Sequence, residues 1–195
     1  MDLIEKLKAG NRWYVYEGDR AIREMTAQYG QHPYAIVICC SDSRVIPELI
    51  FGAELGDLFV IHVAGNVLDN HQLGSIEYAA AHLHCELVVM LGHTGCGAVE
   101  AAVTGHGDGF ISYITEDILE AAGEERDPDK ACRLNVRHGV ERIQREFAQH
   151  PEIGEITVKG AVYDTKSGAV EWLDDSGAEG GSRNETVRDE GLQSL

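Results

Sequence analysis

Short runs of apolar residues alternate along this chain with segments whose apolar residues recur at helical spacing. Four runs consist mostly of branched residues, as strands buried on both faces do, and they lie at 35–39, 58–61, 87–91 and 156–163. The turn residues Lys166-Ser167-Gly168 then precede residues 169–173, which we expect to form an antiparallel edge strand. The pattern therefore predicts a sheet built from these runs.

Helical patterns lie between the predicted strands, at 74–83 and 98–103. A longer helix starts near Pro128, a residue that suits the first turn of a helix. Its apolar stripe consists of Val136, Val140, Ile143 and Phe147. Alternating strands and helices predict an α/β fold, a single domain with a mainly parallel central β-sheet flanked by helices.

The two ends of the chain depart from this central pattern. We expect residues 1–30 to form an N-terminal helical arm, whose aromatic segment Trp13-Tyr14-Val15-Tyr16 would be unusually exposed in a monomer. Residues 174–195 are rich in acids and glycine and poor in apolar residues, which predicts an acidic, mobile tail, with an arm docked in an oligomer as the alternative. Residues 1–173 are therefore the expected catalytic domain.

The balance of charge limits the partners that we expect. The chain has 33 acidic and 16 basic residues and a net charge of −17. Nucleic acid and anionic membranes attract clustered lysine and arginine, so neither is an expected partner. We see no secretory signal and no apolar stretch of membrane-spanning length. Because the five cysteines are odd in number and do not suggest a disulfide framework, we expect a cytoplasmic location.

Two cysteines and a histidine lie where two predicted strands end. Cys40 follows the first strand, and His93 and Cys96 follow the third. Ligands bind beyond the carboxyl ends of parallel strands, so these side chains should meet at one edge of the sheet. Three such ligands leave one position of a tetrahedral zinc ion open, as catalytic sites do, whereas structural sites use four. We therefore predict one Zn²⁺ per chain.

The loop after Cys40 carries one acidic and one basic residue. Asp42 is close enough in sequence to reach the open side of the metal, and Arg44 can hold its carboxylate through a bidentate contact. Since two thiolates neutralise the charge of Zn²⁺, a nearby group must hold the reacting water. Asp42 and Arg44 are therefore the predicted catalytic pair, with a surface ion pair of little consequence as the alternative.

Cys40-Ser41-Asp42-Ser43-Arg44 and His93-Thr94-Gly95-Cys96, in this order, resemble the motifs of the β-class carbonic anhydrases. Gly56-Asp57-Leu58-Phe59-Val60-Ile61 and Gly74-Ser75-Ile76-Glu77-Tyr78 extend the resemblance, which runs from about Leu3 to Leu173. It implies the zinc ligands and the catalytic pair just named. The implied reaction is the reversible hydration of CO₂ to bicarbonate and a proton by zinc-bound hydroxide.

The same resemblance implies a narrow apolar pocket for CO₂. By motif match, Gln31 would donate a hydrogen bond to a bicarbonate oxygen, and Gly97 would lie at the substrate beside the ligand Cys96. Phe59, Ala64 and a Tyr78 from the partner subunit would line the pocket. The family interlocks its N-terminal helices in dimers that often pair further, so we expect a homodimer or a dimer of dimers (a homotetramer).

One feature of the family is incomplete in this chain. A bicarbonate-regulated subclass carries a Trp–Arg–Tyr triple, and the matching positions are Val37, His62 and Tyr163, of which only the tyrosine is kept. An imidazole cannot bind an oxyanion bidentately, as a guanidinium does. We therefore expect no regulatory bicarbonate site of that kind.

Two other functions remain open on the sequence. Relatives of this fold hydrolyse carbonyl sulfide or carbon disulfide, and the sequence separates these substrates poorly from CO₂. A non-catalytic, zinc-stabilised binding protein is the second alternative, although it would need neither Asp42 nor Arg44. Cys39 and Cys85 are interpreted as core or strand-end cysteines rather than redox-active ones.

Overall fold

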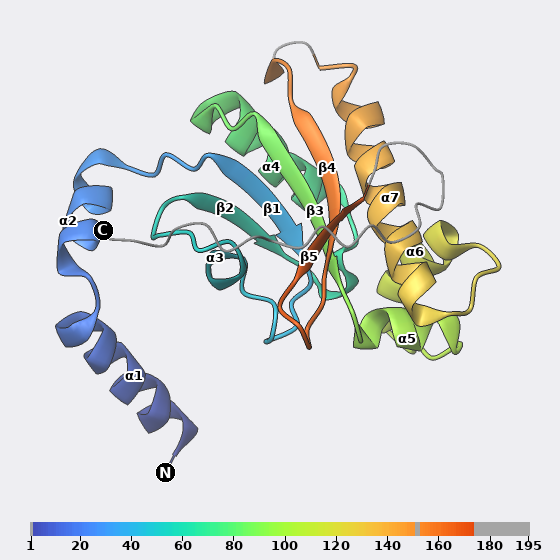
Figure 1. Cartoon of the computed structure of the whole chain (residues 1–195), viewed down its shortest axis with the longest axis horizontal. Helices are drawn as coiled ribbons and strands as arrows, with labels where there is room; N and C mark the ends of the chain where they lie inside the picture. The colour runs from blue at the N-terminus through green and yellow to red at the C-terminus, as the bar shows by residue number, and fades with distance from the viewer. Residues whose placement is uncertain (1, 151–152, 174–195) are drawn as a thin grey trace, which may run out of the picture.

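A central five-stranded sheet organises the chain (Figure 1), for which a computed structural model describes residues 2–150 and 153–173. Its strands, in spatial order, are β2 (Leu58–His62), β1 (Ala35–Cys39), β3 (Leu87–His93), β4 (Thr157–Tyr163) and β5 (Val170–Leu173). Strands β1 to β4 are parallel, and β5 pairs antiparallel with β4. The mainly parallel sheet and its antiparallel edge strand are thus confirmed. Strand β3 runs two residues beyond the predicted 87–91, so His93 is its last residue.

Seven α-helices and one 3₁₀ turn accompany these strands in the described residues. They are α1 (Leu3–Glu17), α2 (Arg20–Tyr29), α3 (Pro47–Ile50), η1 (Ala64–Asn66), α4 (Asn70–Leu83), α5 (Gly97–Val103), α6 (Ile111–Ala122) and α7 (Pro128–Phe147). Helices α4, α5 and α7 cover the three predicted helices, and Pro128 does open α7. The sequence analysis missed α6, although Ile111, Ile114 and Ile118 recur there at helical spacing.

The sheet separates two apolar clusters because successive side chains of a strand point to opposite faces. Ile36 and Ile38 of β1 join the larger cluster, to which helices α4, α5, α6 and α7 contribute Ile76, Val99, Ile118 and Val136. Val37 and Cys39 face the smaller cluster, which the segment of α3 covers through Ile50 and Phe51. Cys40, two residues after Ile38, therefore returns to the face that helices α4 to α7 cover, and it belongs to the larger cluster.

Helix α7 packs closely on β3 beside the predicted metal site. A Cβ placed at Gly92 would lie 2.6 Å from Val136 Cγ2 and 2.9 Å from Cys132 Sγ, both on α7. A Cβ at Gly160 of β4 would lie 2.9 Å from Val136 Cγ1. Glycine at these two positions lets the helix backbone approach the strands, and the first position directly precedes the ligand His93.

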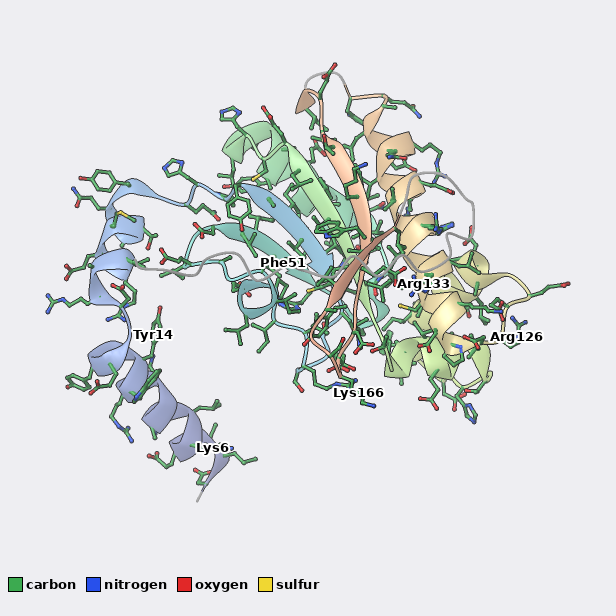
Figure 2. All side chains as sticks on the ribbon, in the orientation of Figure 1. Lys6, Tyr14, Phe51, Arg126, Arg133 and Lys166 are labelled. Atoms are coloured by element: carbon green, nitrogen blue, oxygen red, sulfur yellow. The ribbon has the colours of Figure 1, made fainter. Side chains whose placement is uncertain are left out.

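Helices α1 and α2 form the N-terminal arm and extend away from the sheet (Figure 1). Neither helix has a buried residue. The Arg23 side chain joins the two helices, because it donates hydrogen bonds to the carbonyl oxygens of Tyr14 and Val15 at 2.9 and 3.1 Å and lies over the Tyr14 ring. Figure 2 shows Lys6 and Tyr14 on this arm, away from the sheet. The arm thus presents apolar side chains, among them the 81% exposed Tyr16, that residues 31–150 and 153–173 do not cover.

The predicted acidic tail at 174–195 lies outside the described residues. No helix of the described segments is long and apolar enough to cross a membrane.

Candidate metal centre

Three elements bring the predicted ligands together at the carboxyl edge of the sheet. Cys40 follows β1, His93 ends β3, and Cys96 is the N-cap residue of α5. Their ligand atoms all lie within 4.8 Å of one another, and the two sulfurs are 3.9 Å apart. All three residues are buried. In the described parts of the chain, no other group of three such residues is arranged in this way.

The hydrogen bonding of His93 leaves one ring nitrogen for a metal. Its Nδ1 lies 3.1 Å from the carbonyl oxygen of Thr94. A carbonyl oxygen only accepts, so Nδ1 carries a proton, and in the neutral ring Nε2 therefore presents its lone pair. Nε2 is buried and has no hydrogen-bond partner among the described residues. A buried, unpaired lone pair aimed at two sulfurs is what a metal site requires.

The two sulfurs form a single acid–base unit. The hydrogen bond that the Cys96 thiol donates lowers the pKa of Cys40, and the same bond raises the pKa of Cys96. The backbone N–H of Gly65 also donates to Cys40 Sγ, at 3.3 Å. The two cysteines therefore share one proton, which a divalent cation held by both sulfurs would displace. Two thiolates and one neutral imidazole are donors that zinc prefers, so these residues fit Zn²⁺.

The three buried cysteines outside this group differ from Cys40 in that their pKa values are raised. Burial raises the pKa of Cys39 to about 12 and that of Cys132 to about 11, and it also raises the pKa of Cys85. Cys85 donates its S–H to the carbonyl oxygen of Pro33 at 2.9 Å. These are neutral thiols inside the core, and the interpretation of Cys39 and Cys85 as core cysteines is confirmed.

Asp42 and Arg44 form a bidentate pair beside the ligands. Arg44 Nε donates to Asp42 Oδ1 at 2.9 Å and Nη2 donates to Oδ2 at 2.7 Å, while the Arg44 backbone N–H also donates to Oδ1. The guanidinium holds the pKa of the Asp42 carboxyl well below its usual range. Asp42 Oδ2 lies 4.0 Å from His93 Nε2, the nitrogen free for a metal. Arg44 also donates to the carbonyl oxygen of Gly95 at 3.1 Å, which ties the two motif loops together.

The residues expected around the substrate lie on several elements. Phe59 of β2 and Ala64 of η1 are half-buried, whereas Gln31, before β1, and Gly97, the first residue of α5, are exposed. Tyr78 of α4 is exposed, and its ring centroid lies 6.2 Å from that of Phe59 in the same chain. The expectation that Tyr78 of the partner subunit lines the pocket stays a prediction.

The sequence analysis missed Gly65, which holds the ligand sulfur through its backbone. Gly65 has a φ of +67°, and a Cβ there would lie 2.8 Å from Ile118 Cδ1. Only glycine suits both conditions. No local pattern marks this role, because it arises when η1 folds against Cys40 and α6.

Comparison with known proteins supports this arrangement. The family model described as carbonic anhydrase matches residues 35–170. A carbonic anhydrase of Mycolicibacterium smegmatis is 37% identical over 150 residues, which cover 74% of this chain and 70% of that protein. The crystal structure of a β-carbonic anhydrase of Aspergillus fumigatus superposes with a TM-score of 0.78 and 28% identity, over 91% of this chain and 94% of that one.

A further solved structure comes from a work on two tetrameric β-carbonic anhydrases of Sordaria macrospora. It superposes with a TM-score of 0.72 and 27% identity, over 87% of this chain and 95% of that one. The chain therefore belongs to the β-carbonic anhydrase family.

Proposed function

We propose that this chain is a carbonate dehydratase that interconverts CO₂ with bicarbonate and a proton at one Zn²⁺ held by Cys40, His93 and Cys96. When bound, zinc supplies the Lewis acidity that lets water give up a proton near neutral pH. The observation that carries the proposal is the Asp42 carboxylate, held by Arg44 with Oδ2 4.0 Å from the free nitrogen of His93. A site with structural zinc alone has no use for this pair.

The Asp42–Arg44 pair has two tasks in this reaction. The ionised Asp42 carboxylate accepts a hydrogen bond from the reacting water and so orients it toward CO₂. Arg44 donates to both carboxylate oxygens, which keeps Asp42 ionised and fixes its position beside the metal ligands. Because the Arg44 side chain is about half exposed, the pair also connects the buried ligands with solvent, where the product proton must go.

The two alternatives gain no support from the relatives described above. These proteins are named for carbonic anhydrase activity, not for hydrolysis of carbonyl sulfide or carbon disulfide. A non-catalytic zinc protein leaves the geometry of Asp42 and Arg44 unexplained.

Stopped-flow measurement of CO₂ hydration by the zinc-loaded protein tests the proposal, with carbonyl sulfide as the second substrate. We expect rapid CO₂ hydration that is lost on removal of zinc and restored by its return. Hydrolysis of carbonyl sulfide without CO₂ hydration would favour the first alternative. Inactivity toward both substrates with zinc bound would favour the non-catalytic reading.

We further propose that the active unit is at least a homodimer that buries the N-terminal arm. No residue of α1 or α2 is buried, so their apolar and aromatic side chains are exposed. A second copy of the chain is a suitable partner to bury them. The tetrameric Sordaria relatives support further pairing of dimers.

A cytoplasmic location agrees with ligand thiols that must stay reduced in order to bind metal.

A further inference from the structure

The β4–β5 hairpin reaches the peptide that follows the metal ligand His93. Both β3 and β4 are parallel, so the chain leaves them at the same edge of the sheet, where β4 turns into β5 (Figure 1). The Thr94 backbone N–H donates to the carbonyl oxygen of Tyr163, the last residue of β4, at 3.0 Å. The loop that holds His93 and the turn of the hairpin are therefore direct neighbours.

Thr165 of this turn contacts Thr94 in three ways. Its backbone N–H donates to Thr94 Oγ1 at 3.1 Å, the two hydroxyl oxygens are 3.1 Å apart, and its Oγ1 lies 3.4 Å from the Thr94 carbonyl oxygen. One assignment of the protons satisfies all three contacts: the Thr94 hydroxyl donates to Thr165 Oγ1, and the Thr165 hydroxyl donates to the Thr94 carbonyl. That carbonyl is the acceptor of the His93 Nδ1–H.

The turn that carries Thr165 is itself well held. Asp164 Oδ1 accepts the backbone N–H groups of Lys166 and Ser167 at 2.9 and 2.7 Å, and the Asp164 N–H donates to the carbonyl oxygen of Ala169. Gly168 closes the turn with a φ of +80°. Figure 2 shows Lys166 at the outer end of this turn. Thr165 is half-buried beneath it, on the side of Thr94.

We propose that Thr165 is a positioning residue for the metal ligand His93, acting through the carbonyl group of Thr94. By holding this carbonyl, Thr165 fixes the ring orientation of His93 and the tautomer that presents Nε2 to the metal. Hydrogen-bond partners of metal-binding histidines set ligand orientation and basicity, and their loss typically weakens metal binding by about 10–100-fold. Thr165 is one hydrogen bond further from the metal than Thr94, so loss of its hydroxyl should weaken zinc binding by about tenfold, at the lower end of that range.

The test compares variants by zinc affinity, and it rests on the proposed zinc site. Thr165→Val keeps the shape and the backbone N–H but removes the hydroxyl, and Thr165→Ser restores it. Ser167→Ala is the matched control, because the contacts of its hydroxyl, with the Ala169 N–H and the Asp164 carboxylate, lie within the same turn. We expect competition with a chelator to show about tenfold weaker zinc binding for Thr165→Val, and near wild-type affinity for Thr165→Ser and Ser167→Ala.

A second readout separates positioning from general stability. In ¹⁵N NMR spectra of the zinc form, the Nδ1–H signal of His93 should shift or exchange faster in Thr165→Val only. Should Thr165→Val fold poorly, Thr94→Val removes the hydroxyl on the other side of the same network without changing the sequence of the hairpin, and it should also weaken zinc binding. Zinc affinity of a folded Thr165→Val within twofold of wild type, or an equal loss in Ser167→Ala, would overturn the proposal. Failure of the wild type to bind zinc would refute the metal site itself.

Discussion

One added methyl group at Gly92 should destabilise the fold and weaken the metal site together. Gly92 lies in β3, one residue before the ligand His93. The new Cβ of Gly92→Ala would lie 2.6 Å from Val136 Cγ2 and 2.9 Å from Cys132 Sγ. Both distances are shorter than non-bonded carbon and sulfur atoms tolerate, so either α7 or β3 must move.

The size of the effect follows from how little room the neighbours have. Val136 is 0% exposed and Cys132 is 3% exposed, so neither side chain can turn toward solvent. Overpacking costs about 1–3 kcal/mol in general, and the enclosed neighbours place this site in the upper half of that range, at about 2–3 kcal/mol, while the reduced freedom of the unfolded chain returns about 0.4–1 kcal/mol. The net loss is roughly 1–2.5 kcal/mol, which for a chain of this length lowers Tm by roughly 2–10 °C.

Thermal unfolding of the zinc-loaded variant at one fixed protein concentration measures this loss. Zinc affinity should fall as well, because the Cys132 thiol donates to the backbone carbonyl of His93 at 3.4 Å and moves with α7. The matched control is Gly92→Ala combined with Val136→Ala, which removes the atom that the new methyl group meets. Residues in contact couple by about 0.5–3 kcal/mol, so the double variant should be more stable than the sum of the single losses predicts.

Two results would refute this reasoning. The first is an unchanged Tm of Gly92→Ala, which would mean that α7 does not pack on β3 as closely as described. The second is strict additivity of Gly92→Ala and Val136→Ala, which would place the cost somewhere other than in their contact.

Four further predictions concern the site and the assembly. Cys96→Ser should lose zinc and much stability, because metal binding contributes to folding, and metal analysis with full zinc occupancy would contradict the assigned ligand set. Asp42→Asn should keep zinc but lose about a hundredfold or more in CO₂ hydration, and near wild-type turnover would reduce the Asp42–Arg44 pair to an ion pair. Removal of residues 1–30 should leave a smaller assembly with little activity, and sedimentation that finds a fully active monomer would exclude the need for the arm. High bicarbonate should not inhibit CO₂ hydration cooperatively at pH 6.5 or 8.5, because Val37 is buried and His62 Nδ1 already lies 3.2 Å from the Cys40 carbonyl oxygen. Cooperative inhibition at both pH values would contradict this prediction.

Several features of the fold and site can be predicted from the sequence because they depend on residues close together in the chain. A continuous apolar run such as residues 35–39 is typical of a strand that is buried on both faces, whatever its neighbours are. Cys40, His93 and Cys96 are likewise recognised by residue type and by their position after strands. The contact of Asp42 with Arg44 spans two residues of one loop, so it too depends on little beyond that loop.

Other features depend on which distant segments the fold brings together. Gly65 holds the Cys40 sulfur from a turn 25 residues away, and Thr165 lies 71 residues from Thr94. A hydrogen bond needs its two atoms placed within a few tenths of an ångström. Only the packing of η1 against Cys40 and α6, and of the β4–β5 turn against Thr94, sets those positions. The sequence by itself therefore determined the type of metal site and its ligands, while the tertiary structure decided which groups hold those ligands in place.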